Sequence, residues 1–85
     1  SNAIRNYHKN ILGLAQNKIE TVDVNEREFS STTMAINSKN LNKAKKLMRE
    51  FREEILELMG TGSLDQVYQF SMQFFPLSHK ETKDK

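Results

Sequence analysis

The sequence contains no cysteine and no tryptophan, and its 85 residues include a single proline. The absence of cysteine excludes a disulfide framework and thiolate chemistry, and it fits a reducing compartment. No apolar run approaches the roughly 20 residues that a membrane-spanning helix needs, and the start does not resemble a signal peptide. We therefore expect a cytoplasmic protein with no membrane partner.

Apolar residues are also scarce, since they make up only 36% of the chain. A chain of this length allows one small domain, and short chains bury a smaller share of their surface than long ones. The net charge of +2 is too small to predict a nucleic-acid partner by itself. The core is expected to be thin, so a partner subunit or further chain should help to complete it.

The two ends of the sequence differ from its middle. Residues 1–3 (SNA) resemble the remnant of a cleaved expression tag, and no initiator methionine precedes the native text. Residues 79–85 (HKETKDK) follow Pro76 and are all polar. This composition at the end of the sequence predicts a disordered tail. We expect residues 4–78 to form a single small domain, cut from a longer protein.

Two stretches have the apolar spacing of amphipathic helices. The first runs from Ile4 to about Val22, where apolar residues recur every three or four positions. The second follows a plausible N-cap at Asn37 and Ser38 and ends at Gly60, which we expect to adopt a positive φ. Its seam consists of Leu41, Ala44, Met48, Phe51, Ile55 and Leu58.

Two other stretches alternate with the period of a strand. Residues 27–36 (REFSSTTMAI) hold four adjacent hydroxyl residues, which are poor helix formers, and alternation places Thr32, Met34 and Ile36 on one face. Residues 67–75 (VYQFSMQFF) end before Pro76, which cannot donate to a strand ladder. Their apolar face carries Tyr68, Phe70, Met72 and Phe74.

The predicted order is therefore α-β-α-β, an α+β fold. We expect the amphipathic helices to pack on a small sheet, because a helix stripe and a strand face of this kind must cover each other. Two strands alone are marginal, so a dimer partner or the missing chain would complete the sheet. The predicted core comprises Met34, Ile36, Leu41, Met48, Phe51, Ile55, Leu58, Tyr68, Phe70, Met72 and Phe74.

No residue pattern indicates catalysis, a metal or a cofactor. His8 and His79 are the only imidazoles, and no nucleophile has a base at a recognisable spacing. Residues 60–63 (GTGS) follow a helix and lack the lysine of a phosphate-binding loop. The aromatic face of residues 67–75 carries no interleaved charge, so we interpret it as core rather than a base-stacking surface. We expect a protein that is not an enzyme.

The charges of the second helix are distributed unusually. Its basic residues lie near the start and its acidic residues near the end, whereas the helix dipole favours the reverse. Three interpretations stay open: a solvated face, an antiparallel contact between two copies, and a nucleic-acid contact through the basic start. The candidate residues are Lys39, Lys43, Lys46, Arg49, Glu50, Glu53 and Glu57.

Four stretches together carry a family resemblance: RNYHKNILGLAQ, REFSSTTMAI, FREEILELM and VYQFSMQFFPLS. In this order and spacing they resemble the C-terminal segment of an uncharacterised bacterial family with a domain of unknown function. Some of its members are described as transcriptional regulators. The resemblance implies a dimerisation or regulatory domain, with DNA bound through a preceding N-terminal part. It implies no catalytic or ligand-binding residue.

Overall fold

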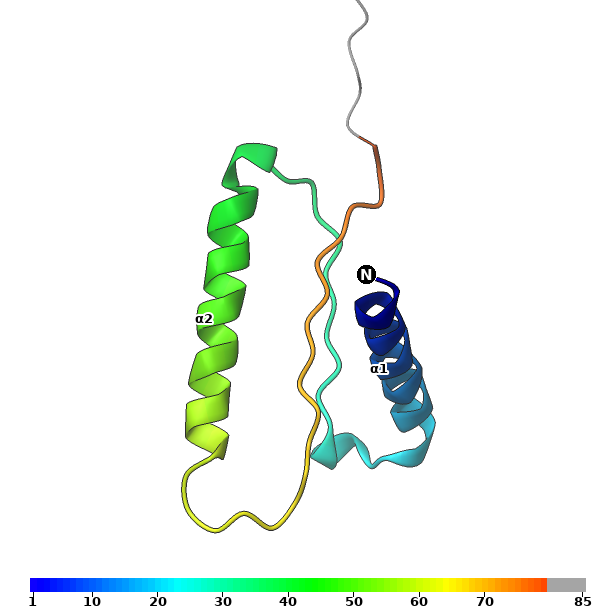
Figure 1. Ribbon diagram of the computed structural model, residues 1–85, viewed down its shortest axis with the longest axis vertical. Helices are drawn as coiled ribbons and strands as arrows, with labels where there is room; N and C mark the ends of the chain where they lie inside the picture. Colours follow the sequence, from blue (N-terminus) through cyan, green and yellow to red (C-terminus); the bar gives the residue numbers. More distant parts are fainter. Residues whose placement is uncertain (80–85) are drawn as a thin grey trace, which may run out of the picture. The chain divides into compact units, whose positions relative to one another are not determined.

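The computed structural model describes residues 1–79, which contain two long helices, α1 (Asn2–Thr21) and α2 (Leu41–Met59) (Figure 1). Two single 3-10 turns, η1 (Val24–Glu26) and η2 (Ser38–Asn40), follow α1 and precede α2. The chain divides into two units, Ser1–Ile36 and Asn37–Lys85. Among residues 1–79, each unit therefore has one long helix, one 3-10 turn and one extended loop segment. The predicted polar tail lies outside the described residues from position 80 onward.

Helix α1 confirms the helix that apolar spacing predicts between Ile4 and Val22, with a start two residues earlier. The Ser1 hydroxyl accepts a hydrogen bond from the Ile4 backbone N–H at 3.4 Å, so it serves as the N-cap. At the other end, the Val22 N–H donates to the Lys18 carbonyl at 3.1 Å, and Val22 itself is extended. The first three residues thus form the cap and first turn of α1.

Helix α2 confirms the second predicted helix. The Asn37 carboxamide oxygen accepts from the Lys39 N–H at 3.0 Å, which caps η2 just ahead of α2. The helix ends at Met59, and the Gly60 N–H donates to the Leu56 carbonyl at 3.0 Å. The expected positive φ at Gly60 is wrong, because Gly60 has φ −86° and Gly62 has φ +88°.

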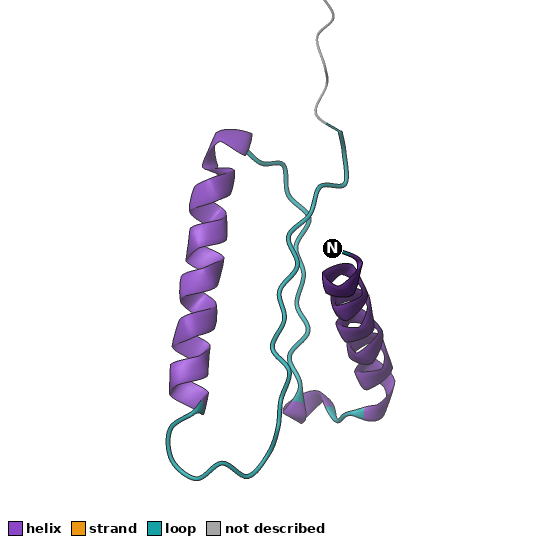
Figure 2. Cartoon of the chain, viewed as in Figure 1, coloured by secondary structure: helices purple, strands orange, loops and turns teal. Residues whose placement is uncertain are grey.

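The predicted α+β fold is wrong, because residues 1–79 contain helices and no strand (Figure 2). Residues 27–37 and 63–76 are loop, although both had the alternation of strands. Alternation decides which side each side chain takes, but a strand also needs a ladder of backbone hydrogen bonds. Outside the helices, the backbone bonds of the described residues close turns and helix ends.

Part of the predicted alternation survives without a ladder in residues 67–75. Phe70 and Phe74 are 38% and 39% exposed, whereas Val67 and Phe75 are 99% and 68% exposed. Met72 is half-buried, and the intervening Gln69, Ser71 and Gln73 are exposed. The segment after α2 therefore keeps one apolar side, as a two-residue period requires.

Candidate interaction surfaces

Residues 1–79 hold no group of three or more His, Cys, Asp or Glu side chains that could bind a metal ion. His8 instead lies edge-on to the Tyr7 ring, with centroids 5.7 Å apart. Shallow surface hollows lie beside Phe29, Ser30 and Ser31 and on the last turns of α2. No helix of this part of the chain is long and apolar enough to cross a bilayer. The candidate sites are therefore surfaces.

The first surface is the apolar face of α2. Ala44, Met48 and Ile55 on this face are half-buried, although none of the described residues is buried. The Phe51 ring contacts the Phe70 ring edge-on, at 6.1 Å between centroids and an interplanar angle of 70°. This geometry is one that aromatic pairs prefer. The predicted pairing of this helix face with the aromatic side of residues 67–75 is therefore present at Phe51 and Phe70.

Much of this apolar face still meets solvent. Phe51 is 50% exposed and Leu58, also predicted to lie in the core, is 69% exposed. Leu41 is 40% and Tyr68 is 65% exposed. The contact with Phe70 thus leaves much of the helix face exposed, so the assignment of these residues to a core stays a prediction for the protein with its partners.

The second surface is the apolar stripe of α1. Ile11 and Ala15 lie in the middle of the stripe and are half-buried. Ile4, Tyr7 and Leu14 are 60%, 55% and 56% exposed. Single apolar side chains are common on protein surfaces, but these residues form a contiguous exposed apolar patch. Contiguous patches of this kind mark interaction sites.

Arg27 organises the end of the same unit, and the sequence analysis did not identify it. Its Nε donates to the Val22 carbonyl at 3.0 Å, and its guanidinium lies 5.6 Å from the centre of the Phe29 ring. Arg27 is half-buried, so it folds the chain back onto the end of α1. The spacing of an arginine two residues before a phenylalanine was the available signal, since a cation can stack on such a ring.

The same unit holds Met34 and Ile36, which were predicted to lie in the core. They are 59% and 53% exposed. The hydroxyl residues 30–33 are exposed as well, including Thr32, which alternation placed on the same face as Met34 and Ile36. No side chain of residues 28–36 is half-buried or better, so this segment contributes no packed layer to its own unit.

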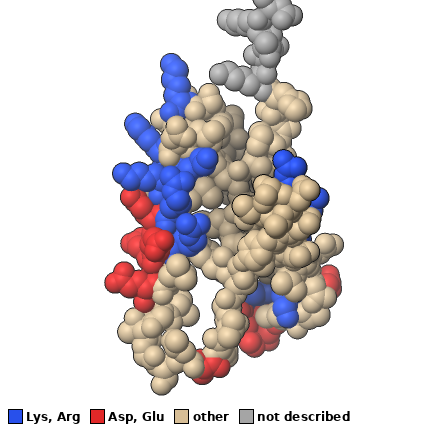
Figure 3. All heavy atoms as spheres, in the orientation of Figure 1, with Lys and Arg blue, Asp and Glu red and all other residues tan. Residues whose placement is uncertain are grey.

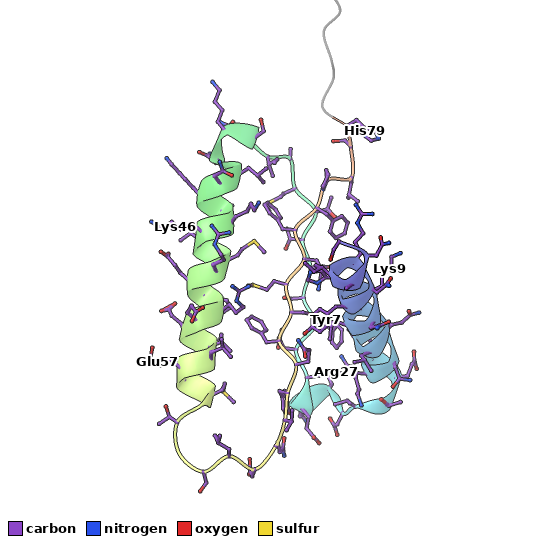
Figure 4. All side chains as sticks on the ribbon, in the orientation of Figure 1. Tyr7, Lys9, Arg27, Lys46, Glu57 and His79 are labelled. Carbon is purple, nitrogen blue, oxygen red and sulfur yellow. The ribbon has the colours of Figure 1, made fainter. Side chains whose placement is uncertain are left out.

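The third surface is the charged face of α2. Figure 3 shows basic side chains over the N-terminal half of this helix and acidic side chains over its C-terminal half. Lys46 and Glu57 project from the same side of the helix (Figure 4). All seven candidate residues are exposed: Lys39, Lys43, Lys46, Arg49, Glu50, Glu53 and Glu57.

This charge distribution opposes the dipole of α2 at both ends. The first turn has no acidic residue and the last turn has no basic residue. Each misplaced charge near a helix end costs about 0.3–1 kcal/mol at low ionic strength. Such an arrangement lowers the stability of the helix in isolation.

Comparison with known proteins gives the family. The family model described as Domain of unknown function (DUF4423) matches residues 1–77. No curated protein matches the chain, and no solved structure matches it either. Because the match spans nearly the whole sequence, the chain belongs to the DUF4423 family.

Proposed function

We propose that this chain is a non-enzymatic interaction domain that self-associates. The observation that carries the proposal is the exposure of apolar side chains on both helices, such as Tyr7 at 55% and Phe51 at 50%. Covering apolar surface contributes about 25 cal/mol per Å², and it is the main favourable term in most protein association. A second copy would cover the stripes that the chain leaves open.

The proposal places the domain in a cytoplasmic bacterial transcriptional regulator. The support is the family match over residues 1–77 together with the sequence resemblance to C-terminal segments of such proteins. In this arrangement DNA binds through another part of the protein, and this domain brings two copies together or receives a signal. Two-fold pairing would then match the symmetry of a palindromic operator.

Sedimentation velocity over a range of concentrations tests the self-association. The chain should shift from monomer to dimer, and the variant Tyr7→Ser with Leu14→Ser should shift at higher concentration because it lacks part of the α1 stripe. Leu12 lies off the stripe and is 47% exposed, so Leu12→Ser is the matched control. A chain that stays monomeric at every concentration would contradict the proposal.

Genomic-DNA selection with the full-length protein, and with this chain alongside, tests the regulator context. We expect discrete sites to be enriched by the full-length protein alone. If the full-length protein enriches no sites, the regulator role is wrong, while the sedimentation result for the domain keeps its meaning.

A second candidate function is direct nucleic-acid binding by the basic start of α2. The observation that favours it is the exposure of Lys43, Lys46 and Arg49 of α2, and of Lys39 in the preceding turn η2, with no acid in the first turn of α2. Binding by these residues would weaken with salt, with a slope of about −0.9 per phosphate neutralised on duplex DNA. Lys43→Ala with Lys46→Ala should make this slope shallower; no binding of the chain at low salt would exclude the function.

A further inference from the structure

Five charged residues of α2 form a single stripe. Successive members of the stripe are three or four residues apart, which places them on one face of the helix. All five are exposed, and they are Lys43, Lys46, Glu50, Glu53 and Glu57. Arg49 precedes Glu50 near the middle of the helix and is exposed too. The stripe with Arg49 therefore has three cations toward its N-terminal end and three anions toward its C-terminal end.

The long-range charge pairs of this stripe cannot form within one helix. Lys43 and Glu57 are about 21 Å apart along the axis, and Lys46 and Glu53 about 10 Å apart, at 1.5 Å per residue. Lys46 and Glu50 are one turn apart, but a lysine that precedes its glutamate is the less favourable order. Only a second helix could therefore bring Lys43 close to Glu57, or Lys46 close to Glu53.

We propose that two copies of this chain pair antiparallel through the charged stripe of α2, about a two-fold axis near residue 50. In this register Lys43 of one copy lies opposite Glu57 of the other, Lys46 lies beside Glu53, and Arg49 lies beside Glu50. The inference rests on the proposed self-association and specifies its partner, its face and its orientation. It also gives the misplaced charges of α2 a role.

The charge balance of the stripe argues for a second copy over other partners. A nucleic acid or an acidic peptide would attract Lys43, Lys46 and Arg49 and would be repelled by Glu50, Glu53 and Glu57. A twofold contact is self-complementary, so each half of the stripe meets the opposite sign. The backbone dipole has the same polarity as the side-chain charges, and antiparallel helices align both favourably.

The stripe selects the orientation of the pair and does not drive it. Exposed ion pairs are individually weak, because water competes and long side chains lose freedom. The exposed apolar stripe of α1 supplies the attraction, because the apolar face of α2 lies on the opposite side of that helix from the charged stripe. The charged stripe rejects the parallel arrangement by placing like charges opposite each other.

Charge-swap variants test the face. One variant carries Lys43→Glu, Lys46→Glu and Arg49→Glu, and the other carries Glu50→Lys, Glu53→Lys and Glu57→Lys. Each alone should have a dimer dissociation constant raised at least about tenfold at low salt, since six cross-copy pairs become repulsive. An equimolar mixture should regain the affinity of the unchanged chain.

A control with the same change of net charge carries Arg5→Glu, Lys9→Glu and Lys45→Glu, which lie off the stripe. It should keep its dissociation constant within about threefold of the unchanged chain at moderate salt. Unaltered dimerisation of both swap variants would overturn the inference and leave the proposed self-association standing. A monomeric unchanged chain would instead overturn both.

Cysteine crosslinking tests the orientation, because the sequence has no cysteine of its own. Chains with Lys43→Cys and Glu57→Cys, mixed under mild oxidation, should form the mixed disulfide dimer in preference to either homodimer. Predominant homodimers of the Lys43→Cys chain would show a parallel pair and would overturn the antiparallel arrangement.

Discussion

The two units of this chain stabilise their helices by different means. In the first unit, α1 has a side-chain N-cap at Ser1 and a basic residue, Lys18, in its last turn, where the dipole favours one. In the second unit, α2 follows Asn40, which gives no side-chain cap bond, and its charges oppose the dipole. It has instead a ring contact with residues 67–75, through Phe51 and Phe70.

The difference shows where each helix obtains its stability. The end cap and the charge near the C-terminus stabilise α1 through residues close in sequence. In α2 the charges are unfavourable, and the helix is stabilised by packing instead. Most helical stability in proteins comes from the packing of an amphipathic face, so α2 represents the common case and α1 the less common one. Substitutions that remove a packing contact should therefore lower stability most in α2. Substitutions that change helix propensity should have their clearest effect on stability in α1.

The largest effect is expected from Phe51→Ala. Full burial of a phenylalanine would make this change cost about 3–5 kcal/mol. Phe51 is 50% exposed, so we expect about 2 kcal/mol for the chain alone, including the lost ring pair with Phe70. Urea unfolding followed by circular dichroism measures it. Leu56→Ala is the control, because Leu56 lies away from the apolar face and is 60% exposed.

The concentration dependence of this experiment sharpens the comparison. A cost that rises toward 3–5 kcal/mol where the chain self-associates would show that a second copy covers Phe51, and it would contradict pairing through the charged stripe on the other side of α2. A cost below about 1 kcal/mol, no larger than that of Leu56→Ala, would mean that α2 does not depend on this contact.

A smaller effect is expected from Arg27→Lys. The change keeps the charge but removes the Nε donor to Val22 and the planar face over Phe29. The expected loss is about 1 kcal/mol in the first unit, from one hydrogen bond and an exposed cation–π contact. Thermal unfolding measures it, with Arg52→Lys on α2 as the control. Equal effects of both changes would remove the role assigned to Arg27.

An effect of opposite sign is expected from Gly13→Ala. A Cβ at this position meets nothing within 4 Å, so the added methyl has room. Alanine favours a helix interior over glycine by about 0.5–1 kcal/mol, which should raise the melting temperature and the helical signal of α1. A destabilised variant would show that the backbone near Gly13 is approached by a neighbour in solution.

The smallest effect on stability is expected from Lys43→Glu. An acid in the first turn of α2 should stabilise the helix by about 0.3–1 kcal/mol at low salt. The same change should weaken self-association if the charged stripe pairs two copies. Unfolding at low concentration and sedimentation at high concentration separate these two results. Lys45→Glu, with the same charge change off the stripe, should leave the dimer unaltered.

The helices could be predicted from the sequence because their signals are local. Apolar spacing gave α1 and α2 with ends displaced by three residues or less, and Asn37, which was predicted to cap the second helix, caps the 3-10 turn η2 ahead of it. Period, caps and stop signals all lie within a few residues of the structure that they specify. The exposure of the charged face of α2 followed from the same spacing.

The prediction of two strands was wrong because half of what defines a strand, its ladder partner, is not local in the sequence. The alternation of residues 67–75 places Phe70 and Phe74 on one side, but no alternation specifies a ladder partner. Arg27 escaped notice for a related reason, since its hydrogen bond to Val22 depends on a backbone turn after η1. The positive φ was expected at Gly60, and one further turn of the chain placed it at Gly62.

The turn after α2 has a consequence for chirality. Gly60 is constrained by space, because a Cβ there would lie 3.0 Å from the Leu56 carbonyl oxygen, whereas Gly62 is constrained by handedness alone, with open space around it at φ +88°. A mirror-image residue is at ease where an L-residue is strained. In a chemically synthesised chain, D-alanine in place of Gly62 should therefore preserve the reversal of the chain and, by restricting the unfolded state, stabilise it. L-alanine at position 62 has the same atoms as D-alanine but should destabilise the turn. The fold therefore distinguishes two stereoisomers at this one position.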